Sequence, residues 1–252
     1  YPGGTILNLY DELYNYKDKI HHVLTAHEQG ASHAADGYAR STGKVGVCFA
    51  TSGPGATNLV TGIATAYMDS SPIVFITCNV TEQTLGKDAF QEVDITGIAM
   101  PITKAAYLVR DAQTIPGVMR QAFAVAATGR PGPVLIDFVK NVTFPNVEID
   151  YEFVPWRSNR KCGSLKSLST SHDLKAPEPN QGDINALVDM IAQSEKPLLI
   201  CGGGVVRGRA DREFQEFAEK LDAPVAITVM GGGGFPGGHP LPTGMIGMHG
   251  SQ

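Results

Sequence analysis

Apolar residues along the chain form two patterns. In some segments they recur at helical spacing, and in others they form short continuous runs. At the start, Ile6, Leu9, Tyr10 and Leu13 recur at helical spacing and predict an amphipathic helix. Continuous apolar runs, typical of strands buried on both faces, follow at 45–50, 73–77, 105–109 and 134–138, after a short run at 22–24 that also predicts a strand. Helices are predicted after Glu28 and at 59–68 and 115–127. This alternation predicts right-handed βαβ units and a parallel sheet with helices on both sides.

The pattern breaks after Lys140 and resumes near Asp183. Residues 146–182 are rich in proline, lysine and serine and predict a linker. The second series predicts a helix that ends at Ser194, a strand at 198–201, a helix at 210–221 and a strand at 225–229. We therefore expect an α/β protein with a parallel-sheet domain at 1–145 and a Rossmann-like domain at 183–252. Both ends of the sequence are expected to be cut, so the second domain is expected to be truncated.

Composition excludes several classes of function. The 252 residues carry a formal net charge of −5 and no basic run, which argues against a nucleic-acid partner. No apolar run approaches the length of a membrane span. The four cysteines are far apart and predict buried free thiols in a reducing compartment, here the cytoplasm. Histidine spacing offers no metal ligand set, so we predict no metal bound by this chain alone.

Two segments place candidate chemistry at predicted strand ends. Glu28 stands where the predicted strand at 22–24 meets an Ala- and Gly-rich helix, a position suited to acid/base work. An ordinary surface or capping glutamate is the alternative. The loop at 51–58 joins a buried strand to a helix and could turn its backbone amides toward a ligand, although a simple tight turn would look the same.

Other segments are weaker signals when taken alone. Gly202-Gly203-Gly204 follows a buried strand but lacks the full dinucleotide pattern, so nucleotide contact and a plain turn stay open. Asp88 followed by Gln91 is typical of a capped helix start. Arg130 and Lys140 flank a buried strand, where a charged residue is usually solvated.

Together the motifs are far more specific than any of them alone. They closely resemble the thiamine-diphosphate (ThDP) enzyme superfamily and, within it, the large catalytic subunits of acetolactate synthases. The resemblance covers residues 1–145 and about 183–250. The motifs are Tyr1-Pro2-Gly3-Gly4, His27-Glu28-Gln29-Gly30-Ala31, Ala34-Ala35-Asp36-Gly37-Tyr38-Ala39-Arg40, Ser52-Gly53-Pro54-Gly55-Ala56-Thr57-Asn58, Asp88-Ala89-Phe90-Gln91-Glu92, Thr128-Gly129-Arg130-Pro131-Gly132-Pro133 and Gly247-Met248-His249-Gly250.

The resemblance implies a pyrimidine-binding domain at 1–145, an FAD-binding middle domain at 183–252 and a role for Glu28. The family glutamate hydrogen-bonds a pyrimidine nitrogen of ThDP, so that the exocyclic nitrogen can remove the thiazolium proton. Pyruvate is then decarboxylated and joined to a second 2-oxoacid. Pyruvate as acceptor gives 2-acetolactate, and 2-oxobutyrate gives 2-aceto-2-hydroxybutyrate, both precursors of branched-chain amino acids.

Further roles are implied position by position. Gly4 would line the active site. Phe90, Gln91 and Lys140 would border the substrate channel, the last two offering polar contacts to cofactor or substrate. Pro54 and Asn58 would pack near the pyrimidine. Ser70 and Arg130 match positions near a structural FAD that takes no part in the net reaction. The remaining positions implied for FAD are Gly202, Gly203, Gly204, Thr228, Val229, Met230, Gly247, Met248 and His249.

The resemblance also implies partners and shows departures. A homodimer or homotetramer is implied, with ThDP between subunits, Mg²⁺ bound by a C-terminal domain outside this sequence, and a small regulatory subunit. Thr5 stands where the family usually has Ala, and Cys78-Asn79-Val80-Thr81 where Gly-Gln-Val-Pro is common, so Asn79 is assigned no role.

Two alternative functions stay open. One is another ThDP enzyme, such as a glyoxylate carboligase, a sulfoacetaldehyde acetyltransferase or a pyruvate oxidase. The other is a non-catalytic nucleotide-binding or assembly module. Because the resemblance puts half of the ThDP site outside this sequence, the 252-residue chain by itself is expected to show no appreciable turnover.

Overall fold

The protein is described here by a computed structural model that covers residues 2–150, 178–248 and 250. The chain divides into two compact units, Tyr1–Ala176 and Pro177–Gln252, and each is described by itself. Most of the predicted linker, 151–177, lies outside the described residues. The domain limits predicted at 145 and 183 stay predictions.

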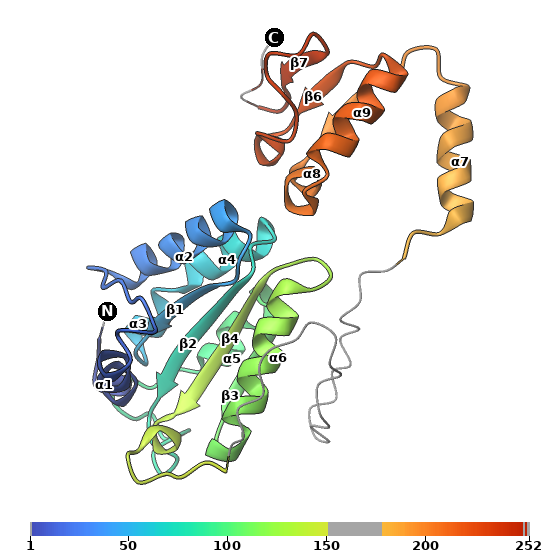
Figure 1. Ribbon diagram of the computed structural model, residues 1–252. Helices are drawn as coiled ribbons and strands as arrows, with labels where there is room; N and C mark the ends of the chain where they lie inside the picture. Colours follow the sequence, from blue (N-terminus) through green and yellow to red (C-terminus); the bar gives the residue numbers. More distant parts are fainter. Residues whose placement is uncertain (1, 151–177, 249, 251–252) are drawn as a thin grey trace. The chain divides into compact units, whose positions relative to one another are not determined.

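The first unit is organised around a four-stranded parallel sheet (Figure 1). Its strands, in spatial order, are β1 (Gly46–Ala50), β2 (Ile73–Asn79), β4 (Pro133–Val139) and β3 (Ala105–Val109). Every residue of β2 and β4 is buried, because both strands are central and helices cover both faces. The predicted α/β class and parallel sheet are confirmed.

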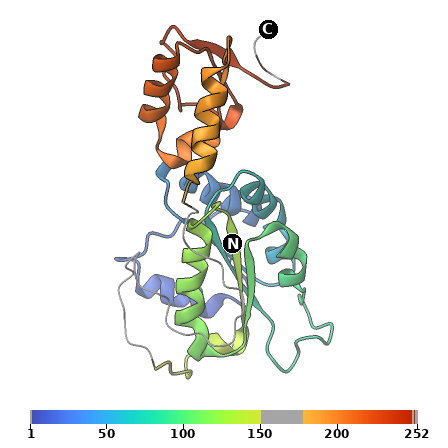
Figure 2. The same ribbon diagram turned by 90° about the vertical axis from the view of Figure 1, so that its right-hand side faces the viewer.

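Helices pack on both faces of this sheet, and side chains alternate between the faces along each strand. Val74, Ile76 and Cys78 of β2 lie in one core with α1 (Leu7–Asn15) and α6 (Ile115–Ala127). Ile73 and Phe75 lie in the other core. That core is built with α2 (Glu28–Thr42), α3 (Pro54–Thr57), α4 (Val60–Met68) and α5 (Ile95–Ala99). Figure 2 shows the strands between α6 and the helices of the opposite face. Short 3₁₀ turns, η1 (Met100–Ile102), η2 (Ala112–Thr114) and η3 (Lys140–Thr143), join these elements.

Glycines of two neighbouring elements permit a close approach to α2. A Cβ on Gly62 of α4 would overlap the side chain of Ser32 in α2. A Cβ on Gly46 of β1 would lie 2.5 Å from the carbonyl oxygen of Ala35. Helix α2 therefore packs closely on both α4 and β1, and its first residue is held firmly relative to the sheet.

The second unit contains a three-stranded parallel sheet in the order β5-β6-β7. The strands are β5 (Leu199–Cys201), β6 (Val225–Ile227) and β7 (Pro242–Met245), and the helices are α7 (Gln181–Ala192), α8 (Gly203–Gly208) and α9 (Asp211–Leu221), with a 3₁₀ turn η4 (Val229–Gly231). Cys201, Ala218, Val225 and Phe235 form its core. Strand β7 was not predicted, because Pro242-Thr243-Gly244-Met245 is not an apolar run.

Some predicted elements are wrong. The segment at 22–24 forms no strand; the His22 ring packs edge-on against Tyr10, and Val23 and Leu24 are exposed. A three-residue apolar run has too few positions to distinguish a strand from a loop that rests on a helix. The strand predicted at 225–229 ends at Ile227, where the Thr228 side chain caps η4.

The cysteine prediction holds where the structure describes it. Cys48, Cys78 and Cys201 are buried free thiols, and Cys162 lies outside the described residues. Within the described ranges, no helix is long and apolar enough to cross a membrane.

The contact between α2 and α4 yields a testable prediction. Gly62→Ala should lower the free energy of unfolding by about 1–3 kcal/mol, because the new methyl group overlaps Ser32, although alanine is the better helix former. Gly37→Ala in α2 is the matched control. Nothing lies within 4 Å of its Cβ position, so it should be neutral or stabilising by roughly 0.5–1 kcal/mol. Urea unfolding of both variants makes the comparison, and equal effects would contradict it.

Candidate active site

Glu28 is the first residue of α2, and its carboxylate is buried. The cap of this helix is His27, whose Nδ1 accepts a hydrogen bond from the Gln29 amide at 3.1 Å. Glu28 is 6% exposed. The alternative of an ordinary surface or capping glutamate is therefore wrong. A helix N-terminus favours negative charge, which offsets part of the cost of burying this carboxylate.

Asn58 and Gly55 of the glycine-rich loop meet the two oxygens of Glu28. Asn58 Nδ2 donates to Glu28 Oε2 at 3.0 Å. A Cβ on Gly55 would lie 3.2 Å from Glu28 Oε1 and 2.6 Å from Thr51 Cγ2, so a side chain there would crowd both residues. Two motifs separated by 30 residues of sequence thus form one site.

The loop that carries Gly55 is also tied to the start of the chain. Thr5 Oγ1 donates to the Cys78 carbonyl at 2.7 Å and accepts from the Ser52 amide at 3.1 Å. A Cβ on Gly3 would lie 2.5 Å from Thr51, whereas one on Gly4, which is exposed, would meet nothing within 4 Å. Ser52 Oγ is buried, and no residue that the structure describes hydrogen-bonds to it.

Gln91 lies against the same loop. A Cβ on Gly53 would lie 2.6 Å from the Gln91 carbonyl oxygen, and Gly53 has a φ of 56°. Both the lack of space and the positive φ therefore require glycine at this position. The neighbouring Phe90 is 88% exposed. The predicted capped helix start at Asp88 is wrong, because Asp88 and Gln91 both have positive φ. Helix α5 instead begins after Asp94, whose Oδ1 accepts from Thr96 Oγ1 and the Gly97 amide; these bonds lower the pKa of Asp94.

Lys140 stands at the carboxyl end of β4, as its position in the sequence predicts. Its amide donates to the Val80 carbonyl, just beyond the end of β2, at 3.2 Å. In a parallel sheet the carboxyl ends of the strands share one edge, which is where α/β proteins bind ligands. Glu28, Asn58, Gln91 and Lys140 therefore belong to one edge of the first sheet, although their roles stay predictions.

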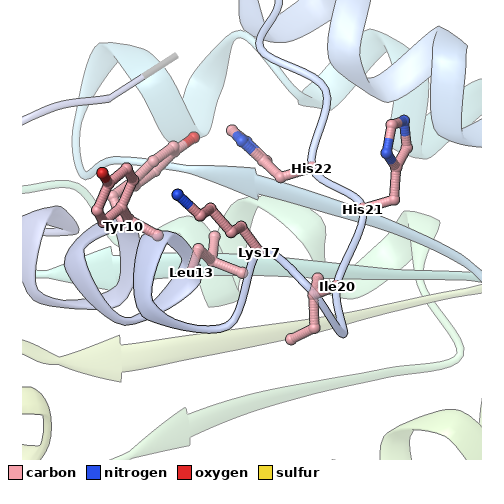
Figure 3. Close-up of a pocket in the computed structure, with 7 residues that line it drawn as sticks. Tyr10, Leu13, Lys17, Ile20, His21 and His22 are labelled. Carbon is pink, nitrogen blue, oxygen red and sulfur yellow. The ribbon is translucent and has the colours of Figure 1, made fainter.

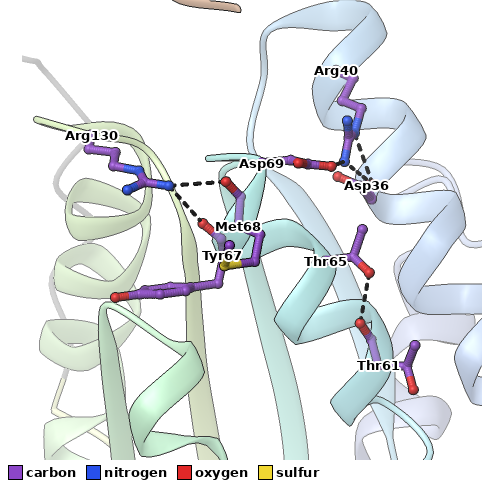
Figure 4. A network of polar contacts seen from close by, with 8 residues as sticks. All are labelled: Asp36, Arg40, Thr61, Thr65, Tyr67, Met68, Asp69 and Arg130. Carbon is purple, nitrogen blue, oxygen red and sulfur yellow. Dashed lines mark hydrogen bonds and ion pairs between the residues drawn. The ribbon is translucent and has the colours of Figure 1, made fainter. Parts of the chain in front are cut away.

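Ser70 and Arg130 meet at the opposite edge, where β2 and β4 begin. Arg130 Nε donates to Ser70 Oγ at 2.7 Å. Its Nη2 donates to the Met68 carbonyl at 3.0 Å, as Figure 4 shows. The guanidinium thus caps the last turn of α4, where a cation is favoured. On the α2 side of the same turn, Arg40 bridges Asp36 and Asp69 at 2.9 and 2.6 Å. The structure pairs Ser70 with Arg130 but separates both from Glu28.

Three segments of the second unit share one sheet edge. Gly202-Gly203-Gly204 follows β5, Thr228-Val229-Met230 follows β6, and Gly247-Met248 follows β7. The Thr228 amide donates to the Cys201 carbonyl at 2.9 Å, and a Cβ on Gly203 would lie 3.1 Å from Met230 Cβ. Val229 and Met248 are 72% and 94% exposed. The residues predicted for FAD in the second unit thus lie at one edge of its sheet, except His249, which lies outside the described residues.

A pocket of about 360 Å³ lies elsewhere in the first unit (Figure 3). Its lining comes from α1 and the segment that follows: Tyr10, Leu13, Tyr14, Lys17, Ile20, His21 and His22. Burial lowers the pKa of His22. None of these residues carries a predicted role, and no group of three His, Cys, Asp or Glu within the described ranges could hold a metal ion.

A buried polar cluster that the sequence did not predict lies beside the site. Asp137 of β4 is 1% exposed and accepts hydrogen bonds from Thr77 Oγ1 at 2.7 Å and Asn79 Nδ2 at 2.8 Å. Burial raises its pKa to about 6. The signal was available in the sequence, because Asp137 is a single carboxylate inside an apolar run. The residues that hydrogen-bond to Asp137 could not be predicted, because they depend on the pairing of β2 with β4.

Comparison with known proteins places both units. Residues 1–98 match the family described as "Thiamine pyrophosphate enzyme, N-terminal TPP binding domain", and residues 184–252 match "Thiamine pyrophosphate enzyme, central domain". The chain is 50% identical, over its whole length, to a protein of Arthrospira platensis named "Acetolactate synthase", of which it covers 42%. It is 47% identical to a "Probable acetolactate synthase large subunit" of Methanocaldococcus jannaschii, again over its whole length, and covers 41% of that protein.

A third relative shows a similar relationship. An "Acetolactate synthase large subunit" of Corynebacterium glutamicum is 48% identical over 99% of this chain, which covers 38% of that protein. The chain thus spans about 40% of the length of these curated relatives.

The raised pKa of Asp137 makes a prediction about pH. Burial, together with the negative charge of Asp94, outweighs the hydrogen bonds from Thr77 and Asn79, so the folded chain favours the protonated carboxyl. This contribution to stability is complete below pH 3.8, the ordinary pKa, and is lost as the pH rises to about 6. Asp137→Asn has no such loss. Relative to the unchanged chain, its free energy of unfolding should rise by on the order of 2 kcal/mol between about pH 4.5 and 7.

Denaturant unfolding of both proteins across this pH range measures the difference. A difference that stays constant with pH would show that Asp137 titrates at its ordinary pKa in the folded protein.

Proposed function

The chain belongs to the thiamine pyrophosphate enzymes, and from this premise we propose that it forms part of the large, catalytic subunit of an acetolactate synthase. The whole protein would decarboxylate pyruvate and join the two-carbon remainder to a second 2-oxoacid. Pyruvate as acceptor gives 2-acetolactate, and 2-oxobutyrate gives 2-aceto-2-hydroxybutyrate. The names of the three relatives support this proposal over a glyoxylate carboligase, a sulfoacetaldehyde acetyltransferase or a pyruvate oxidase.

One observation carries the proposal: the Glu28 carboxylate is buried, with one oxygen held by Asn58 and the other beside Gly55. These residues fit the aminopyrimidine end of thiamine diphosphate. Gly55 lets the segment 51–58 approach Oε1 without a side chain that would crowd the carboxylate. When bound, thiamine diphosphate supplies an acidic carbon centre and an electron sink for decarboxylation.

The residues of this chain would act mainly by holding and moving a proton. The hydrogen bond from Asn58 orients the Glu28 carboxylate and leaves Oε1 to share a proton with a ring nitrogen. Burial strengthens that interaction, because water does not compete for the carboxylate. Pro54 would present an apolar face to the ring. Lys140 and Gln91, at the same sheet edge, would donate to the carboxylate of a 2-oxoacid, while Phe90 and Gly4 would border its path.

Other parts of the proposal rest on fewer observations. The gathering of the glycine and exposed apolar residues at the carboxyl edge of the second sheet supports FAD binding there. Ser70 and Arg130 are proposed as further FAD contacts. Mg²⁺ would be bound outside this sequence. We also infer a homodimer or homotetramer, a small regulatory subunit and a cytoplasmic location, the last supported by the buried free thiols.

The product of the reaction tests the function. The whole protein, supplied with thiamine diphosphate, Mg²⁺ and FAD, should convert pyruvate to 2-acetolactate and CO₂, as followed by NMR. Added 2-oxobutyrate should yield 2-aceto-2-hydroxybutyrate. Consumption of pyruvate without either product would reject the proposal in favour of another thiamine-dependent enzyme.

Glu28 has its own test. In the whole protein, Glu28→Gln should reduce turnover by about 10²–10⁴-fold, because the amide cannot share a proton with the ring nitrogen. Thermal unfolding should be little changed, since glutamine keeps the shape and can still accept the Asn58 hydrogen bond. Glu213→Gln, at an exposed position of α9 in the second unit, is the matched control and should keep its activity. Near-normal turnover by Glu28→Gln would exclude the assigned role.

A further inference from the structure

The buried polar cluster of the first sheet lies on the face that α5 covers. Thr77 and Asp137 are directly paired in the register of β2 and β4, and Asn79 ends β2 on the same face. The three side chains are 0%, 1% and 4% exposed in the order Thr77, Asp137, Asn79. Burying a carboxylate and an amide costs free energy that an apolar residue at either position would avoid. We therefore examined what the cluster contacts outside the sheet.

Asn79 connects the cluster to the loop that precedes α5. Its Nδ2 donates to Asp137 Oδ2 at 2.8 Å and to the Val93 carbonyl at 3.2 Å, while its Oδ1 accepts from the Val80 amide at 2.8 Å. The amide group thus uses both of its hydrogens and its oxygen, which leaves it one orientation. Asp137 fixes Asn79, and Asn79 fixes the chain at Val93.

Residues 86–93, which form this loop, are also held by Gly53 and by hydrogen bonds within the loop. The Gln91 backbone packs on Gly53, next to the loop that reaches Glu28. The Glu92 carboxylate accepts from the Ala89 amide at 2.8 Å and from the Gly86 amide. Residues 86–93 are therefore held at Gln91 by Gly53 and at Val93 by Asn79, and Phe90, which directly precedes Gln91, is exposed.

We propose that Asn79 and Asp137 are positioning residues, which set the placement of Phe90 and Gln91 relative to Glu28 through the Val93 carbonyl. The inference rests on the proposed function for the identity of the substrate, a 2-oxoacid. Misplacing a substrate-positioning group by about 1 Å can cost on the order of 100-fold in rate. Loosening the loop should weaken the binding of substrate more than it slows the chemistry at Glu28.

Thr77 provides a matched control. It makes the other hydrogen bond to Asp137 and is equally buried, but its side chain hydrogen-bonds to no residue of 86–93, all of which the structure describes. In the whole protein, Asn79→Leu should raise KM for pyruvate by about 10- to 100-fold with a smaller change in kcat. Thr77→Val should keep KM within about twofold. Asn79→Gln, which keeps the amide, should recover most of the loss.

Hydrogen exchange tests the same point without relying on the reaction. Amides in residues 86–93 should exchange at least tenfold faster in Asn79→Leu than in Thr77→Val. If the whole protein makes no acetolactate, the proposed function fails, but this measurement still decides the role of Asn79. If Asn79→Leu does not fold, Asn79→Ser replaces it, because a serine hydroxyl is too short to bond Asp137 and Val93 together. Equal effects of the Asn79 and Thr77 variants on both exchange and KM would overturn the proposal.

Discussion

The complete burial of β2 and β4 is the constraint on which the first unit depends. Two central parallel strands need helices on both faces, and these helices bring their loops to the two edges of the sheet. At the carboxyl edge the loops deliver Glu28, Asn58, Gln91 and Lys140. At the amino edge they deliver Ser70 and Arg130. The division between a proposed thiamine site and a proposed flavin contact therefore follows from the direction of the strands.

Glycine permits the close contacts that turn this edge into a site. Gly55 lets the loop approach the Glu28 carboxylate, and Gly53 lets the Gln91 backbone pack on the same loop with a positive φ. Any larger residue at either position would force the two segments apart. These close approaches hold Glu28 and Gln91 against the segment 51–58 at this edge of the sheet.

Glu28 and Asp137 are two buried carboxylates near this edge, and their surroundings differ. Glu28 lies at a helix N-terminus and has one oxygen beside Gly55, and its proposed role is to share a proton with a bound ring. Asp137 lies inside the sheet, where its two oxygens are taken by Thr77 and Asn79. A carboxylate whose oxygens are both satisfied suits fixing a structure better than moving a proton. The surroundings of Glu28 therefore suit its proposed role in proton transfer, and those of Asp137 suit its proposed role in positioning.

The sequence by itself determined the alternation of strands and helices, the parallel sheet and the motifs of the thiamine enzymes, because these depend on local apolar runs and on residues close together in the chain. The strand predicted at 22–24 and the helix start predicted at Asp88 were wrong, because a short apolar run and a capping pattern are too brief to specify backbone geometry. The meeting of Glu28 with Asn58, of Gln91 with Gly53 and of Asn79 with Asp137 was decided only by the tertiary structure. Each of these pairs is 12 or more residues apart, and only the pairing and packing of the strands and helices brings them together.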